Sequence, residues 1–108
     1  DATGLRAISR LPPLPAPRLE ALQIPDVAEI LEHVADLYLV QTADILGHSH
    51  LAEFVEPRHE AMAVVWELNR YTLTELGQLF NRTNEGVLYG LQRHYERLRG
   101  QHQNARAA

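Results

Sequence analysis

The side chains of this chain that could read a nucleic acid gather around one polar turn. Asn84 and Glu85 stand at the start of an expected helix. Their amide and carboxylate groups can pair with the edges of adenine and cytosine, respectively, in the major groove. Gly86 would let the backbone approach a duplex closely. Tyr89 and Arg93 follow Glu85 by four and eight residues, so a helix places them on the same face. This set predicts a surface that contacts double-stranded DNA.

Arginines near the turn could bind the phosphates of such a duplex. Arg82 and Thr83 lie in the turn itself, whereas Arg93 and Arg97 lie further along the second helix. Phosphate contacts supply most of the non-specific affinity for DNA. The alternative interpretation is that Asn84 only caps the helix and that the arginines are solvated. The expected DNA-binding set is Arg82, Thr83, Asn84, Glu85, Gly86, Tyr89 and Arg93.

Two histidines suggest a metal site as a second kind of chemistry. His48 and His50 lie in the segment Gly47–Glu56, where Glu53 would be a third ligand. Their spacing is a poor match to the usual paired ligands, so a solvated loop or a frayed helix is the simpler interpretation. No nucleophile with its base, no carboxylate pair and no phosphate-binding loop emerges from the pattern. The sequence therefore predicts neither an enzyme nor a cofactor.

The elements that must position these residues are two helices joined by a tight turn. Thr72 and Glu75 form a capping box that starts the first helix. The polar run 81–84 ends it, and a second amphipathic helix follows, with apolar residues recurring every three or four positions. Two helices joined so tightly predict a helix-turn-helix. The expected core residues of this pair are Leu76, Phe80, Leu88, Leu91 and Tyr95, packed against Val34, Val64 and Leu68.

Three more helices are expected before this pair. The first has Asp26 as its N-cap, the second is short, starts at Thr42 and stops at Gly47, and the third spans 57–69 with a proline in its first turn. The last helix of the chain should end before Gly100, which would serve as its C-cap. Five helices and no strand signal predict a compact all-α domain.

The two ends of the chain are expected to lie outside this domain. Residues 1–21 are rich in proline, which disfavours helix and sheet, so they are interpreted as a flexible arm or as a linker from an upstream domain. A docking peptide for a proline-binding groove is the alternative. The helical domain is expected over residues 22–100, and residues 101–108 are expected to be a disordered tail.

Composition indicates the compartment only in broad terms. No apolar run is long enough to span a membrane, no signal-peptide pattern stands at the start, and the chain has no cysteine. We therefore expect a cytoplasmic protein, associated with the nucleoid if it binds DNA.

Charge is distributed unevenly and bears on the choice of partner. Residues 1–57 carry three Arg and nine Asp or Glu, a net charge of −6, and residues 58–108 carry seven Arg and five Glu, a net charge of +2, which together give −4. The helix-turn-helix half is thus the less repulsive side for a polyanion. A negative chain is nevertheless a poor starting point for tight DNA binding.

From Val34 to Leu98 the chain resembles the C-terminal DNA-binding domain of the bacterial replication initiator DnaA, and we align the two without a gap. The matching segments are VADLYLVQTADIL, PRHEAMAVVWELNRYTLTELGQLF and LQRHYERL. The middle segment is the most specific, because it reproduces a Pro-Arg helix start and the capping box of the next helix. The resemblance implies a helix-turn-helix domain of the DnaA or Trp-repressor type, with a role in replication or transcription regulation.

The part of that family that touches DNA is the part from which this chain departs. After the phenylalanine that matches Phe80, the family reads Gly-Gly-Arg-Asp-His-Ser/Thr-Thr-Val, whereas this chain reads NRTNEGVL. The Arg, Asp, His and Thr that grip the DnaA box are replaced by Thr83, Asn84, Glu85 and Gly86. The family's basic loop is matched by HSHLA at positions 48–52, which lacks Arg and Lys. Recognition of the usual DnaA box is therefore not expected.

Two functions from different classes follow. The first is a DNA-binding module whose sequence specificity is altered or weakened. The second is a DnaA-like scaffold that has lost DNA binding and contacts a protein partner, for which the acidic first helix would be a natural surface.

Overall fold

The structure, a computed structural model, describes residues 19–107, and within this part the helices are joined by turns and loops and there is no strand. The all-α prediction is thereby confirmed. The elements in order are η1 (Glu20–Gln23), α2 (Pro25–Tyr38), α3 (Thr42–Leu46), α4 (Ala52–Trp66), α5 (Leu73–Phe80) and α6 (Asn84–Ala107).

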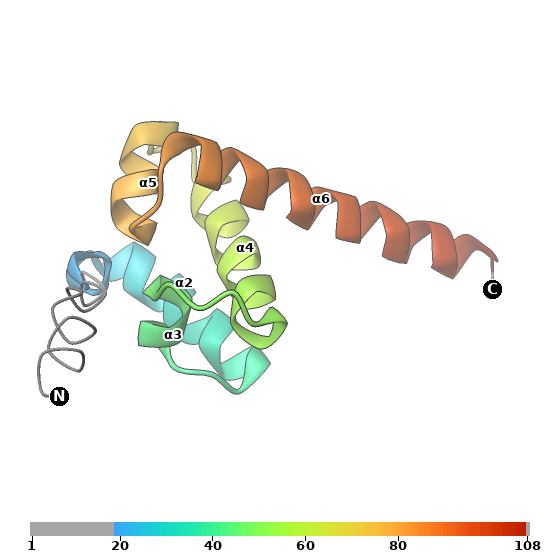
Figure 1. Cartoon of the computed structure of the whole chain (residues 1–108), viewed down its shortest axis with the longest axis horizontal. Helices are drawn as coiled ribbons and strands as arrows, with labels where there is room; N and C mark the ends of the chain where they lie inside the picture. Colours follow the sequence, from blue (N-terminus) through green and yellow to red (C-terminus); the bar gives the residue numbers. More distant parts are fainter. Residues whose placement is uncertain (1–18, 108) are drawn as a thin grey trace, which may run out of the picture.

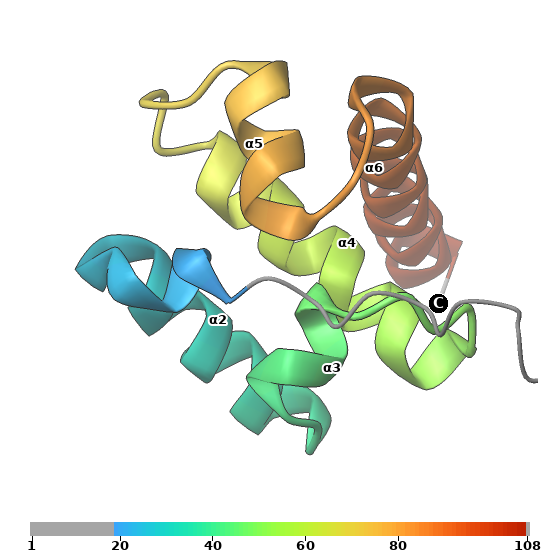
Figure 2. The same ribbon diagram turned by 60° about the vertical axis from the view of Figure 1, so that its left-hand side comes forward.

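Helix α4 lies at the centre, and the other helices pack around it. It contacts α2 and α3 on one side and α5 and α6 on the other, whereas α2 and α6 do not come close to each other. Figures 1 and 2 show α5 and the start of α6 together at one end of the domain, with α2 and α3 at the other. The far half of α6 extends beyond the globular body (Figure 1).

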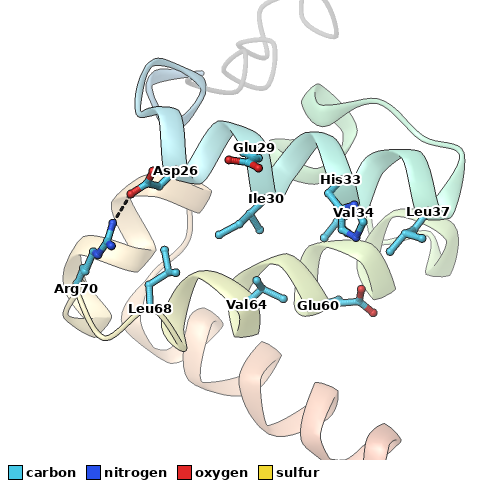
Figure 3. Close-up of a pocket in the computed structure, with 10 residues that line it drawn as sticks. All are labelled: Asp26, Glu29, Ile30, His33, Val34, Leu37, Glu60, Val64, Leu68 and Arg70. Carbon is cyan, nitrogen blue, oxygen red and sulfur yellow. Dashed lines mark hydrogen bonds and ion pairs between the residues drawn. The ribbon is translucent and has the colours of Figure 1, made fainter.

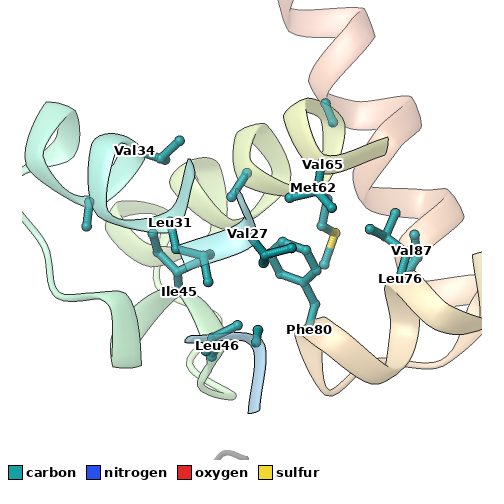
Figure 4. Packing of buried hydrophobic residues seen from close by; sticks show 14 of the residues in the cluster. Val27, Leu31, Val34, Ile45, Leu46, Met62, Val65, Leu76, Phe80 and Val87 are labelled. Atoms are coloured by element: carbon teal, nitrogen blue, oxygen red, sulfur yellow. The ribbon is translucent and has the colours of Figure 1, made fainter. Parts of the chain in front are cut away.

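The core is a single cluster of apolar side chains from all these helices (Figure 4). Phe80 of α5 is fully buried and packs among residues of α2, α3 and α4. Burying such side chains supplies most of the stabilisation, at roughly 1.5–3 kcal/mol each. The largest fully buried side chains are Phe80, Leu31, Ile45, Leu46, Met62, Leu76, Val27, Val34, Val65, Val87 and Pro57.

Two predicted helix starts need correction. Ile24, not Asp26, is the N-cap of α2, and Asp26 lies in its first turn, where it forms an ion pair with Arg70. Helix α4 starts at Ala52, five residues before the expected start, and Pro57 lies inside it. Proline at that point removes one helical hydrogen bond, which the full burial of Pro57 in the core offsets.

One expected core residue of the last helix and the predicted end of that helix also need correction. Val87 and Leu91 of α6 face the core, whereas Leu88 is 46% exposed and lies outside it. Gly90 brings α6 close to α4, because a Cβ there would meet Met62 Sδ at 2.8 Å. Helix α6 runs through Gly100 to Ala107, so Gly100 is no C-cap and the expected disordered tail is helical as far as Ala107.

The expected arm is shorter than residues 1–21. Ala21 is buried in the core, and η1, which contains it, packs against α2 and α5. The proline-rich residues 1–18 and Ala108 lie outside the described part of the chain.

Candidate nucleic-acid interface

The turn between α5 and α6 is closed by backbone hydrogen bonds. Asn81 ends α5 in the left-handed conformation, with a φ of 58°, and the Arg82 N–H donates to Gly77 O at 2.8 Å. This is the Schellman pattern that commonly ends helices. A Cβ on Gly77 would lie only 2.5 Å from Arg82 O, so the turn requires glycine there. The angle between α5 and α6 is therefore set by the backbone.

Thr83 begins α6 by capping its N-terminus. Its Oγ1 accepts the Gly86 N–H at 3.1 Å, which is the bond expected of an N-cap residue. A Cβ on Gly86 would approach Thr83 Oγ1 to 3.3 Å, so Gly86 leaves room for this cap. Thr83 therefore takes the capping role that the alternative interpretation assigned to Asn84.

Asn84 and Glu85 occupy the first two positions of α6, and both are exposed. Asn84 Nδ2 donates to Thr74 Oγ1 at 3.1 Å, which ties the start of α6 to α5. Glu85 benefits from the partial positive charge at the helix N-terminus. An exposed carboxylate at this place repels phosphate unless it accepts a hydrogen bond from a base.

Arg82 faces inward instead of extending into solvent. Its guanidinium donates to Gly47 O at 2.5 Å and to Asn81 O at 3.2 Å, and its Nη1 lies 3.0 Å from His48 Nδ1. Burial lowers the pKa of Arg82. The side chain thus joins the turn to the segment after α3, and its donors are largely occupied before any ligand arrives.

Tyr89 and Arg93 lie on the outer face of α6, as expected. Tyr89 is 59% exposed, and its ring meets the edge of His59 with the centroids 6.0 Å apart. Arg93 is exposed and forms an ion pair of 3.3 Å with Glu96. Arg97, the further candidate for a phosphate contact, donates to His59 Nδ1 at 3.1 Å.

The candidate set thus falls into two groups. Thr83, Arg82 and Gly86 build the turn and the cap, whereas Asn84, Glu85, Tyr89 and Arg93 form the outward surface. His48 contacts Arg82, and no group of three metal-ligating residues occurs within the part of the chain that the structure describes.

Sequence reasoning assigned no role to two buried polar residues of α4. Arg58 is 3% exposed and donates through Nε to Ile45 O at 2.7 Å, through Nη1 to Ser49 O at 2.8 Å and through Nη2 to Asp44 O at 3.1 Å. Burial, with a smaller effect of Arg82, lowers the pKa of Arg58 to about 10, so it remains protonated at neutral pH. The signal was available, since Arg58 falls three residues before Ala61 on the same inward face.

His59 is the second of these residues and is held neutral. Burial, together with Arg97 and Arg58, lowers the pKa of His59 to about 4. Because a guanidinium can only donate, its bond from Arg97 makes His59 Nδ1 the acceptor, and the proton of the neutral ring lies on Nε2.

Together, α5, the closed turn and α6 on their α4 support define a helix-turn-helix domain. The family model described as the bacterial DnaA protein helix-turn-helix matches residues 27–93. This chain belongs to the bacterial DnaA helix-turn-helix family, the C-terminal domain of DnaA.

Curated relatives agree with this assignment. The chromosomal replication initiator protein DnaA of Thermus thermophilus is 40% identical over 95 residues, which cover 86% of this chain and 21% of that protein. The DnaA proteins of Leptospira biflexa and Ruegeria pomeroyi are 28% and 34% identical over 68% and 62% of this chain, and over 17% and 14% of their own length. The chain therefore spans about a fifth of these relatives or less. No solved structure matches it, and no described helix is both long and apolar enough to cross a bilayer.

Proposed function

We propose that this chain contacts double-stranded DNA through the outward surface at the start of α6, with weak, salt-sensitive binding and no preference for the DnaA box. The observation that carries the proposal is the family's helix-turn-helix with a closed turn and a capped α6. Asn84 and Glu85 would face base edges and Arg93 would meet a phosphate. Since the relatives are named chromosomal replication initiators, a role in replication or its regulation is included in the proposal.

The buried position of Val87 suggests a second alignment of the turn. Without a gap, the valine of the family signature falls on Leu88, which is exposed, whereas Val87 is buried. Leaving out one residue of the signature's Gly-Gly pair moves its valine onto Val87 and its arginine onto Arg82. The second alignment keeps the family's arginine as Arg82, whereas its Asp, His and Ser/Thr are still replaced, by Thr83, Asn84 and Glu85. Loss of DnaA-box recognition is therefore expected in both alignments, although the second removes three of the four contacts instead of all four.

Weak binding is expected because few cations are available to phosphate. Arg82 is bonded to backbone carbonyls, and the loop at 48–52 contains no Arg or Lys. Arg93 and Arg97 are the cations left near the start of α6, and each has a partner. With one or two phosphate contacts, log K should fall with log salt at a slope of about −1 to −2.

Competition binding between a DnaA-box duplex and a scrambled duplex tests the proposal. Fluorescence anisotropy at one salt concentration should give equal affinities within a few-fold, because each good bidentate base contact supplies about 1–3 kcal/mol of discrimination and the family's contacts are replaced. A preference above about tenfold would contradict the specificity part of the proposal. Glu85→Gln should raise non-specific affinity, and Asn84→Ala should change sequence preference without altering the salt slope.

Absence of binding would favour the other function. If no duplex binds at about 50 mM salt and tens of micromolar protein, where non-specific binders are usually detected, the DNA proposal fails. A DnaA-like scaffold that contacts a protein partner then becomes the better account.

A further inference from the structure

An apolar groove lies between α2 and α4, on the side of α4 away from α6 (Figure 3). Its volume is about 590 Å³. Ile30, Val34 and Leu37 line it from α2, and Val64 lines it from α4, as Figure 3 shows. From Asp26 to Leu37 the groove follows α2 for about 16 Å at 1.5 Å per residue, the length of about three helical turns.

The rim of the groove is negatively charged. Asp26, Glu29 and Glu60 line it together with one arginine, Arg70, whose charge is paired with Asp26. Tyr38 Oη donates to Glu60 Oε1 at 2.9 Å, which holds that carboxylate at the far end. Helix α2 carries four carboxylates and no arginine. A phosphate-bearing ligand is therefore repelled from this face, and a cationic one is favoured.

Two exposed apolar side chains lie at the C-terminal end of α2, and one of them, Leu37, lines the groove. Leu37 is 61% exposed, and Leu39, the C-cap of α2, is 91% exposed in the left-handed conformation with a φ of 58°. A residue with a β-carbon is disfavoured in that conformation. The turn after α2 thus places a large apolar side chain in water two residues after Leu37, as expected for a surface that a partner covers.

The shape of the groove selects the kind of partner. Strand addition needs a sheet edge, and the described residues 19–107 contain no strand. Polyproline recognition needs aromatic walls, and none of the lining residues is Phe, Tyr or Trp. Lining residues at positions 30, 34 and 37 of α2 and at 60, 64 and 68 recur at helical spacing, which leaves a groove into which a third helix can pack.

We propose that this groove binds an amphipathic helix of about three turns, presented by a separate protein, with leucine-like residues on one stripe and Arg or Lys on both flanks. The apolar stripe covers Ile30, Leu37 and Val64, which keep accessible surface in the groove, and the flanking cations pair with Glu29 and Glu60. The proposal is independent of DNA binding, because α2, which forms one wall of the groove, does not come close to α6, and the groove lies on the side of α4 away from α6 (Figure 3).

A display library of helical 15-residue peptides tests the proposal on the full chain. All members carry an apolar stripe, and the flanking positions vary among Arg, Lys, Gln and Glu. Selection should enrich Arg and Lys, and anisotropy of the enriched peptide should show at least a tenfold loss of affinity for Leu37→Arg and for Glu29→Arg. Both residues are exposed, so folding should be retained, as circular dichroism can check. Glu53→Arg, an exposed carboxylate of α4 outside the groove, is the matched control and should not reduce binding.

Several outcomes would overturn the proposal. These are no enrichment, enrichment of acidic or uncharged flanks, or binding that Leu37→Arg and Glu29→Arg leave unchanged. Peptide binding that strengthens tenfold when residues 1–18 are removed would assign the groove to the chain's own N-terminal segment. Leu37→Arg should bind DNA as tightly as the unaltered chain. Failure of the groove proposal can therefore be distinguished from failure of the DNA proposal.

Discussion

Replacing Arg82 by methionine tests whether this arginine stabilises the fold or contacts phosphate. Methionine keeps an unbranched apolar stem and removes the guanidinium that donates to Gly47 O and Asn81 O. Arg93→Met is the matched control, because Arg93 is exposed and forms its ion pair with Glu96, three residues along the same helix.

The two substitutions should differ in their effect on stability. Hydrogen bonds from a charged donor contribute about 1.5–3 kcal/mol, and the loss of Arg82 leaves the partly buried Gly47 carbonyl without this donor. Burial of the guanidinium, which lowers the pKa of Arg82, costs free energy. This cost offsets part of the stabilisation that the hydrogen bonds provide. We expect Arg82→Met to lower the free energy of unfolding by about 1.5–3 kcal/mol and Arg93→Met by less than about 0.5 kcal/mol.

Urea unfolding and salt-dependent DNA binding measure the two effects. Arg82→Met should lower the urea midpoint by about 1 M and leave the salt slope of binding unchanged. Arg93→Met should keep the midpoint and flatten the slope by about one unit. If Arg82→Met instead flattens the slope by one unit and costs less than about 0.5 kcal/mol, its guanidinium reaches phosphate and the structural role assigned to it is wrong.

Four further substitutions, one of them a control, test the packing of α6 on α4 and its electrostatics. Because the pKa of His59 falls from 6.5 to about 4 on folding, the unfolded chain binds the proton first; stability should be constant above pH 6.5 and fall by up to about 3 kcal/mol as the pH drops to 4. His59→Gln should remove that part of the pH dependence in urea titrations, and an unchanged profile would show that His59 does not cause it. Gly90→Ala places a Cβ 2.8 Å from Met62 Sδ and should cost about 1–3 kcal/mol, whereas Gly100→Ala, with open space around it, should be neutral or stabilising by up to about 1 kcal/mol; equal thermal shifts for the two would contradict the close contact. Leu91→Ala should cost about 2–5 kcal/mol in chemical denaturation, since Leu91 is 6% exposed, and a loss below about half a kcal/mol would place it at the surface.

The sequence predicted the parts of the fold that short-range signals determine. Thr72 and Glu75 form the expected capping box, with Thr72 Oγ1 accepting from the Glu75 N–H at 3.1 Å and Glu75 Oε1 from the Thr72 N–H at 2.9 Å. The short helix from Thr42 and its stop at Gly47 are likewise confirmed. The predicted start of α4 at Pro57 was wrong. Proline is common at the first helical position, and the apolar pattern before Pro57 is weak.

The apolar residues of α6 alone could not decide which of the neighbours Val87 and Leu88 faces the core. Leu88 and Val87 both lie at helical spacing from Leu91, so two inward faces fit the same pattern. The residue that decides between them is Gly90, which carries no hydrophobic signal but is buried against α4. Only the position of α4 shows why the face of α6 that carries Gly90 must lack a side chain there.

The sequence predicted where in the fold the candidate residues lie, but not which of them build the turn and which face outward. All seven residues lie in the turn or in the first three turns of α6. The inward direction of Arg82 depends on Gly47, which is 35 residues away in the chain, and no local pattern contains that information. The role of Arg58 as a buried donor is likewise absent from local patterns, because its acceptors lie 9 to 14 residues earlier in the chain.

The three bonds from Arg58 to the segment around α3 bear on how the domain assembles. Helix α3 has five residues, too few to persist alone in water, and its last carbonyls are held by a side chain only 13 to 14 residues further along the chain. A loop of this size closes in tens of nanoseconds, long before a domain of this kind completes folding. We infer that α3 and the start of α4 form and open as one cooperative unit, early and locally.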